Sequence, residues 1–374
     1  MSSFAVTDLK EIKKHGSDIV VRMLQRDPFA QFTGATHQNC VIAVPESAKG
    51  ASQIQISIVS DLIGAGVKGN QDLDEGEDDL EFLQFPFKGD LIANSHKSPV
   101  DKIMDKTTAG SWRREKKTSL VAWFTRRTVK EKFYTISNDP TNLVIVKKDG
   151  TAGATTADLA EGDTFNTFVI DEMLDRAENG WVDANDVEHP SLESYFIEKS
   201  TEHGMEQVGE FYPIFVGPQS YKALLDDPRW QEAQKHQAYA GLSSAVKGYG
   251  GVYRNAVIIK VPKTSVLKAG IIRSDSPDFN GVYSYTGFSA FKAGGDIVTE
   301  LNFMLGAGAL ALGFDEEPRY AEDDTADSAR KVKAWADQFF GTKKVRFVGE
   351  TTEEKASLYH DKDYAVIVAP STIK

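Results

Sequence analysis

The spacing of apolar and polar positions predicts a mixture of strands and helices that do not alternate regularly. Short runs rich in β-branched and aromatic residues predict strands at Phe211–Val216, at Val252–Val261 and in the closing stretches KKVRFV and DYAVIVA. A further apolar segment runs from Phe303 to Phe314. Because no strand–helix–strand repeat is visible, the pattern predicts an α+β fold rather than a doubly wound sheet.

Two segments in the middle of the chain carry shorter helical patterns. Thr164 is the expected N-cap of the first and Asn179-Gly180 its expected end, with an apolar stripe of Phe165, Phe168, Val169, Met173, Leu174 and Ala177. This stripe predicts a helix packed on the core. After a turn at Gly217-Pro218, a second helix is expected near Gln219–His236, interrupted at Pro228. A glycine-rich hinge is expected at Gly248–Gly251.

A longer, basic helix is predicted between about Ile103 and Ile136, where the chain contains no proline. Apolar residues such as Trp123 and Phe124 alternate there with cations: Arg113, Arg114, Lys116, Lys117, Arg126 and Arg127. Two interpretations stay open. The cations form a solvated face whose aliphatic stems cover the core, or they face nucleic acid or an acidic partner segment.

An acidic cluster follows an apolar, strand-like run between Ile54 and Phe82. After three glycines, the chain places seven carboxylates within ten residues: Asp72, Asp74, Glu75, Glu77, Asp78, Asp79 and Glu81. Closely spaced like charges repel one another and glycines leave the backbone loose, so this segment is unsuited to packing on its own subunit. It is interpreted as an arm that contacts another molecule. The polar N-terminal 50 residues are expected to lie on a neighbour as well.

The same segment half-matches two ligand-binding motifs. Gly64, Gly66 and Gly69 form GxGxxG, but no helix is predicted after them, and the carboxylates that follow would repel a pyrophosphate. Asn70, Asp72, Asp74 and Glu81 have the spacing of calcium ligands, but Glu75 occupies the position where the sharp turn needs glycine. The first motif therefore lacks the structural context that it needs, and the second lacks one of its required residues. Looser calcium or magnesium binding at an interface stays open.

Charge and cysteine content narrow the function classes. The formal net charge of −12 argues against an outer surface that holds duplex DNA, which needs clustered lysine and arginine. A single cysteine, Cys40, excludes an internal disulfide framework and a thiolate zinc cluster. The N-terminus has no apolar signal region and no stretch has the length of apolar sequence that spans a bilayer, so a cytosolic chain without membrane association is expected.

The sequence also lacks the motifs of common catalytic sites. HExxH, GxSxG and GxxxxGK[ST] are absent, and no two histidines are spaced to share one helix face for zinc. His360 beside Asp361 is interpreted as a surface pair, because no nucleophile can be tied to it. We therefore expect no enzyme activity, no catalytic residue, no cofactor and no bound metal.

Several motifs in order resemble those of tailed-bacteriophage major capsid proteins, most of all the family of large-headed podoviruses. They are GAGVKGNQDLDEGEDDLEF, WRREKKTSLVAWFTRR, FYPIFVGPQSYKALLDDPRWQEAQ, GYGGVYRNAVIIKV, GALALGFDEEPRY and DYAVIV, spread from about Ile54 to Val368. The resemblance implies the Hong Kong 97-type capsid fold. That fold has an N-terminal arm, an extended loop, a peripheral domain with a long spine helix, and an axial domain.

Placed on this chain, the resemblance implies five regions. They are an N-terminal arm at 1–52, an extended loop at 53–98, a peripheral domain at 99–190, an axial domain at 191–295 and a return to the peripheral domain at 296–374. The spine helix is expected at about Lys106–Thr128. Contacts between subunits are expected to pair the acidic arm with the basic helix, through Asp72, Asp74, Glu75, Glu77 and Asp78 on one side and Arg113, Arg114, Arg126 and Arg127 on the other.

The implied function is that of a major capsid protein that self-assembles into the icosahedral head shell of a tailed double-stranded DNA bacteriophage. Its expected partners are other copies of itself in hexamers and pentamers, together with scaffolding, portal and decoration proteins. It would enclose DNA without reading its sequence, and it would be found in the virion and, during assembly, in the host cytoplasm. Two alternatives stay open: an encapsulin-like shell of a cellular nanocompartment, and a metal- or nucleotide-binding enzyme that uses residues 64–81.

Overall fold

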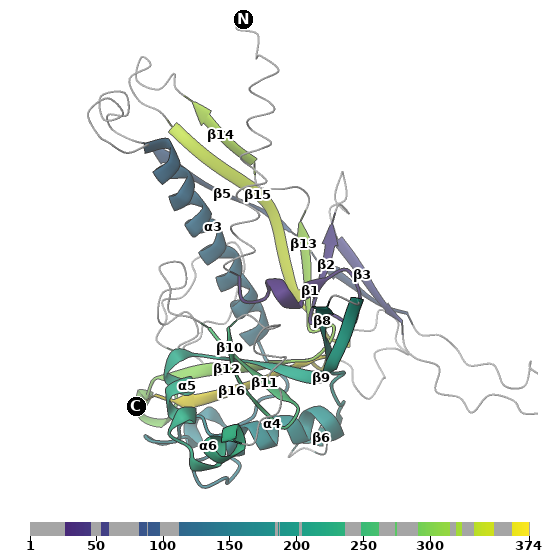
Figure 1. Ribbon diagram of the computed structural model, residues 1–374, viewed down its shortest axis with the longest axis vertical. Helices are drawn as coiled ribbons and strands as arrows, with labels where there is room; N and C mark the ends of the chain where they lie inside the picture. Colours follow the sequence, from purple (N-terminus) through teal and green to yellow (C-terminus); the bar gives the residue numbers. More distant parts are fainter. Residues whose placement is uncertain are drawn as a thin grey trace, which may run out of the picture.

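The computed structural model describes residues 27–45, 54–59, 82–87, 89–97, 112–183, 186, 188–201, 204–235, 248–261, 274, 291–314, 319–323, 333–347 and 361–373. Two six-stranded sheets and a long helix form its framework (Figure 1). The helix, α3 (Trp112–Ser137), runs along the first sheet and reaches the second. The mixed composition of helices and strands confirms the α+β prediction.

The first sheet has the strand order β1-β2-β13-β15-β14, with β5 paired to the other side of β15. Its strands are β1 (Thr33–Gly34), β2 (Val41–Pro45), β5 (Asp90–Lys97), β13 (Leu310–Phe314), β14 (Arg319–Asp323) and β15 (Lys333–Lys344). Ala334 and Ala336 of β15 are fully buried, and the Thr135 hydroxyl of α3 lies 2.7 Å from that of Thr342. The even-numbered residues of β15 therefore face α3.

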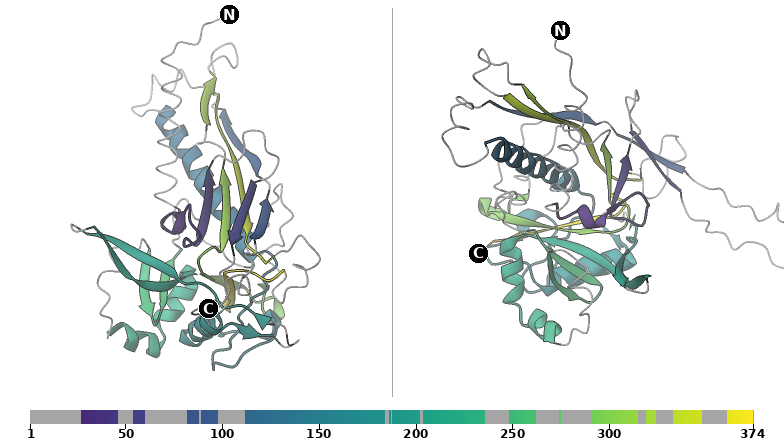
Figure 2. Two further views of the ribbon diagram at one scale, coloured as in Figure 1. Left: turned by 90° about the vertical axis from the view of Figure 1, so that its right-hand side faces the viewer. Right: turned by 45° about the horizontal axis from the view of Figure 1, so that its top comes forward.

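The second sheet has the order β10-β11-β9-β12-β16, with β8 paired to β9. Its strands are β8 (Tyr195–Thr201), β9 (Gly204–Val216), β10 (Tyr249–Tyr253), β11 (Ala256–Lys260), β12 (Thr299–Leu305) and β16 (Val366–Thr372). Figure 2 shows β8 and β9 projecting as a hairpin from this sheet. Every residue of β12 and of β16 is buried, so this sheet is covered on both faces.

Three shorter helices gather around the second sheet: α4 (Thr167–Asn179), α5 (Pro218–Leu225) and α6 (Pro228–Lys235) (Figure 1). Short elements complete the fold. They are the hairpins β3 (Ile54–Val59) with β4 (Phe82–Phe87) and β6 (Trp181–Val182) with β7 (Glu188–His189), and 3-10 turns at Ala30–Phe32, Thr156–Asp158 and Gly294–Asp296.

An aromatic cluster joins the two halves of the fold. The ring of Phe29 lies 4.9 Å from that of Phe133 on α3 and 4.7 Å from that of Phe215 on β9, and the ring of Phe303 on β12 lies 5.5 Å from that of Phe133. All four side chains are fully buried. Segments from four distant parts of the chain thus close one core.

Several predicted boundaries were wrong in detail. The spine helix continues to Ser137 rather than ending near Thr128, while residues 103–111 lie outside the described part of the chain. The cap of α4 is Asn166 and not Thr164, because the Asn166 side chain accepts the hydrogen bond from the Val169 amide. Phe168 was assigned to the buried stripe, but it is 40% exposed. The other five residues of that stripe are buried as predicted.

The region predicted as a hinge and a single strand is a β-hairpin. Residues 249–253 form β10, Arg254 and Asn255 form the turn, and residues 256–260 form β11. Gly251 has a φ of 134°, and an added Cβ would lie 2.7 Å from the Trp230 ring. The glycine there allows a close approach of strand and side chain, so the expected hinge is instead a packed edge strand.

Other predictions were confirmed. The helix expected near Gln219–His236 is broken in two at Pro228, which begins α6. The apolar segment Phe303–Phe314 contributes β12 to the second sheet and β13 to the first, so it connects the two sheets. The five domain boundaries stay a prediction. Strands β12 and β16, from the predicted return to the peripheral domain, share a sheet with β9, from the predicted axial domain. Among the described residues, no helix combines the length and apolar character that crossing a bilayer requires.

Candidate assembly surfaces

The acidic residues expected at subunit contacts belong to the connection between β3 and β4. Asp72, Asp74, Glu75, Glu77 and Asp78 themselves lie outside the described residues. The two strands pair antiparallel, with Val59 opposite Phe82, so the 60–81 segment leaves and re-enters the fold at one end of this hairpin. The topology therefore gives this segment a two-stranded base, as an extended loop requires.

The basic residues expected at these contacts divide into two pairs along α3. Arg113 and Arg114 lie in its first turn, and their side chains are outside the described part of the structure. Arg126 and Arg127 are half-buried and have partners within the subunit. Arg126 Nε donates to the Ala122 carbonyl at 3.2 Å, and Arg127 Nη2 lies 2.7 Å from Glu131 Oε1. Arg126 and Arg127 thus make stabilising contacts within α3.

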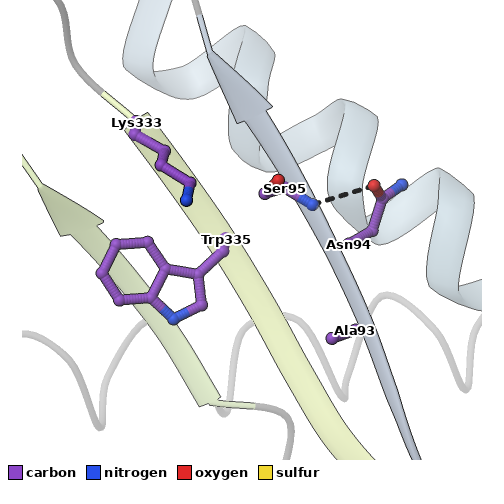
Figure 3. A pocket seen from close by; sticks show the side chains of 5 residues that line it. All are labelled: Ala93, Asn94, Ser95, Lys333 and Trp335. Carbon is purple, nitrogen blue, oxygen red and sulfur yellow. Dashed lines mark hydrogen bonds between the residues drawn. The ribbon is translucent and has the colours of Figure 1, made fainter. Parts of the chain in front are cut away.

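The outward face of the first sheet carries a shallow pocket of about 470 Å³ around Trp335 (Figure 3). Lys333 and Trp335 come from β15, and Ala93, Asn94 and Ser95 come from β5. Cross-strand pairing places Ser95 and Ala321 on either side of Trp335, so small residues flank the indole. The Lys333 ammonium lies 6.0 Å from the centre of that ring. A half-buried indole beside a cation can hold a flat apolar group next to an anion.

Two buried ion pairs hold the layers together, and sequence reasoning missed both. Lys132 of α3 pairs with Asp27 and lies 5.6 Å above the Phe29 ring. Lys344 Nζ lies 2.8 Å from Asp363 Oδ1, and Arg346 Nε donates to the same carboxylate at 3.0 Å. Burial lowers the pKa of Lys344, while the Asp363 carboxylate opposes that shift. Because the partners lie far apart in the sequence, no local spacing could have identified them.

The described residues hold no group of three or more His, Cys, Asp or Glu side chains arranged to bind a metal ion. The single thiol, Cys40, is fully buried, and burial raises its pKa. A protonated, enclosed thiol is a poor nucleophile and a poor metal ligand. Cys40 therefore acts as a small apolar core residue.

Comparison with known proteins identifies the family. The family model described as phage capsid protein matches residues 3–143 and 147–372. The chain belongs to the phage capsid protein family. This match covers the acidic segment, α3 and both sheets, and it confirms the resemblance to tailed-phage major capsid proteins.

Individual relatives of this phage capsid protein agree with the family match. A curated relative, the major structural protein ORF14 of Helicobacter pylori bacteriophage KHP30, is 25% identical over 340 residues, which cover 83% of this chain and 82% of that protein. The head structure of Helicobacter pylori bacteriophage KHP40 aligns with a TM-score of 0.73 at 21% identity, over 93% of this chain and 91% of that one. The capsid of Ralstonia phage GP4 aligns with a TM-score of 0.66 at 16% identity, over 93% and 92%. The Hong Kong 97-type fold class is thereby confirmed.

Proposed function

We propose that this phage capsid protein self-assembles into the icosahedral head shell of a tailed double-stranded DNA bacteriophage. The observation that carries the proposal is the family match over residues 3–143 and 147–372, which includes the segments outside the two sheets. Copies would associate as hexamers and pentamers, in the host cytoplasm during assembly and in the virion afterwards. Portal, scaffolding and decoration proteins are the expected partners. The shell would enclose DNA without reading its sequence and would have no enzymatic activity.

Negative-stain electron microscopy of the full-length chain, with sedimentation velocity on the same sample, tests this function. Closed shells, rings of five or six subunits, or curved sheets are expected. Co-expression with a scaffolding protein is the second arm, because some shells need one to close. A monomer in both arms, at low and at high salt, would contradict the proposal.

Within this function, the acidic segment is proposed to contact the first turn of α3 in a neighbouring subunit. Arg113 and Arg114 lie near the positive end of the helix dipole, where added positive charge is unfavourable. Carboxylates from Asp72, Asp74, Glu75, Glu77 and Asp78 of another copy would offset this cost. Arg126 and Arg127 are assigned a supporting role inside the subunit, since both have internal partners.

A charge exchange tests this contact. Arg113→Glu with Arg114→Glu is expected to reduce assembly yield at least tenfold while the far-ultraviolet circular dichroism of the chain is unchanged. Adding Asp72→Lys and Asp74→Lys to the same chain should restore part of the yield, because the two charges are then reversed together. Lys147→Glu with Lys148→Glu, in a separate loop, is the matched control. Failure of the second pair to restore any assembly would contradict the pairing.

A further inference from the structure

The short hairpin of β6 and β7 follows α4 and makes its inward contacts through one pair of stacked rings. Trp181 and His189 are directly opposed across the two strands, and their rings lie 4.5 Å apart with 18° between their planes. The neighbouring pair, Val182 and Glu188, is exposed. A two-stranded ribbon of this length is not stable by itself, so its position depends on the contacts that its buried side chains make.

A cation in a fixed position contacts the same indole. The Arg176 guanidinium of α4 lies 3.9 Å from the centre of the Trp181 ring. Arg176 is 8% exposed; its Nε donates to Glu172 at 2.8 Å, and its Nη1 donates to the Leu143 carbonyl at 3.1 Å. Leu143 in turn pairs with Val368 of β16. The guanidinium is therefore held between α4 and the edge of the second sheet, and it cannot move away from a second cation without breaking these hydrogen bonds.

The imidazole of His189 is only 6% exposed, and charged groups face it from three segments. Its Nε2 lies 3.9 Å from Asp183 Oδ2, just after β6, while Arg176 comes from α4 and Lys362 and Asp363 come from the segment before β16. Burial lowers the pKa of His189 below its ordinary value of 6.5; Lys362 and Arg176 lower it further, and the two carboxylates oppose the shift. The unfolded chain therefore binds this proton more readily than the folded chain. The stability that the neutral imidazole contributes is fully present above about 6.5 and is lost as the pH falls below that value.

Protonation would place a second cation on the indole that Arg176 already contacts. An indole face attracts a single cation. Two cations on one ring repel each other, however, and the new charge would be buried away from water. Because Arg176 is held by its hydrogen bonds, the group that can respond is the imidazole together with the strand that carries it.

We propose that the stacked Trp181–His189 pair is a proton-sensitive clasp that holds the β6–β7 hairpin against α4. With a neutral imidazole, the rings stack and the hairpin is closed on the helix. Uptake of one proton by His189 opens the stack, because the imidazolium moves toward water and toward the Asp183 carboxylate. The hairpin is then released in mildly acidic solution, while the aromatic core around Phe133 keeps its contacts. This inference does not depend on the assembly proposed above.

The test is tryptophan fluorescence of the full-length chain between pH 8 and pH 4.5, with the emission of Trp181 obtained as the difference from Trp181→Phe. The unchanged protein is expected to show a transition with a midpoint below 6.5. Across it, the emission of Trp181 should move to longer wavelength and its quenching by acrylamide should rise at least about twofold. His189→Gln should remove the transition. His37→Gln, at an exposed histidine, is the matched control and should leave it unchanged.

Two charge variants keep the result unambiguous while leaving His189 in place. Asp183→Asn removes an anion beside the imidazole and should move the midpoint to lower pH, whereas Lys362→Gln removes a cation and should move it to higher pH. A general loss of stability would move both midpoints in the same direction. Circular dichroism and sedimentation velocity must show the same fold and assembly state for all variants at pH 8. A transition that persists in His189→Gln, no transition in the unchanged protein, or shifts of the two charge variants in one direction would overturn the proposal.

Discussion

The two sheets of this phage capsid protein differ in how many of their faces are covered by the same subunit. In the second sheet, β12 and β16 are buried at every residue. In the first sheet, α3 covers one face, and the other face exposes Leu91 to 54% and carries the Trp335 pocket. A sheet covered on both faces contributes mainly to the stability of the subunit, whereas a sheet open on one face leaves an apolar surface for contacts with other molecules.

The largest expected effect is the difference in unfolding free energy between truncating a buried phenylalanine in the second sheet and truncating a half-buried one in the first sheet. Phe303→Ala removes a fully buried ring that contacts Phe133, and it should lower the free energy of unfolding by about 3–5 kcal/mol. Phe339→Ala makes the same chemical change at a half-buried site on the open face of β15, so its cost should be at most about half as large. Urea denaturation of both variants measures the difference, and equal costs would break the comparison.

A smaller effect is expected where the edge of the second sheet packs on a helix. Gly251→Ala should cost about 2–3 kcal/mol, because the new Cβ would lie 2.7 Å from Trp230 at a φ of 134°. Gly162→Ala is the matched control: its φ is 99°, but no atom lies within 4 Å of the added Cβ, so only the backbone strain remains. If both variants unfold at the same urea concentration, the close packing at β10 contributes nothing measurable.

The smallest expected effect concerns α4, a helix that packs against the second sheet. Asn166→Ala removes the side chain that accepts from the Val169 amide at 3.2 Å, and it should cost about 1 kcal/mol. Asn179→Ala, at the other end of α4, removes an exposed contact with Asp175 and should cost less than about 0.5 kcal/mol. Calorimetric melting temperatures distinguish the two, and a loss at Asn166 no larger than that at Asn179 would contradict the assignment of Asn166 as the N-cap.

The contact residues could be predicted only in part. Arg127 stood out as a cation on a basic helix, but its partner Glu131 did not, because the sequence gives no sign that one acidic residue of a charged helix is buried. Trp335 lies in a stretch whose strand was predicted only from Lys343 onward, whereas β15 begins at Lys333.

The sequence by itself determined the local elements and the family. The helical spacing of Val169, Met173 and Ala177 was sufficient for α4, and Pro228 was sufficient for the break between α5 and α6, because each of these signals lies within one short segment. The order of motifs from about Ile54 to Val368 identified a phage capsid protein. Only the tertiary structure decided which elements meet. It paired Asp27 with Lys132 across 105 positions and divided Phe303–Phe314 between two sheets. Such contacts depend on the packing of the whole chain, so the spacing of residues along one segment cannot predict them.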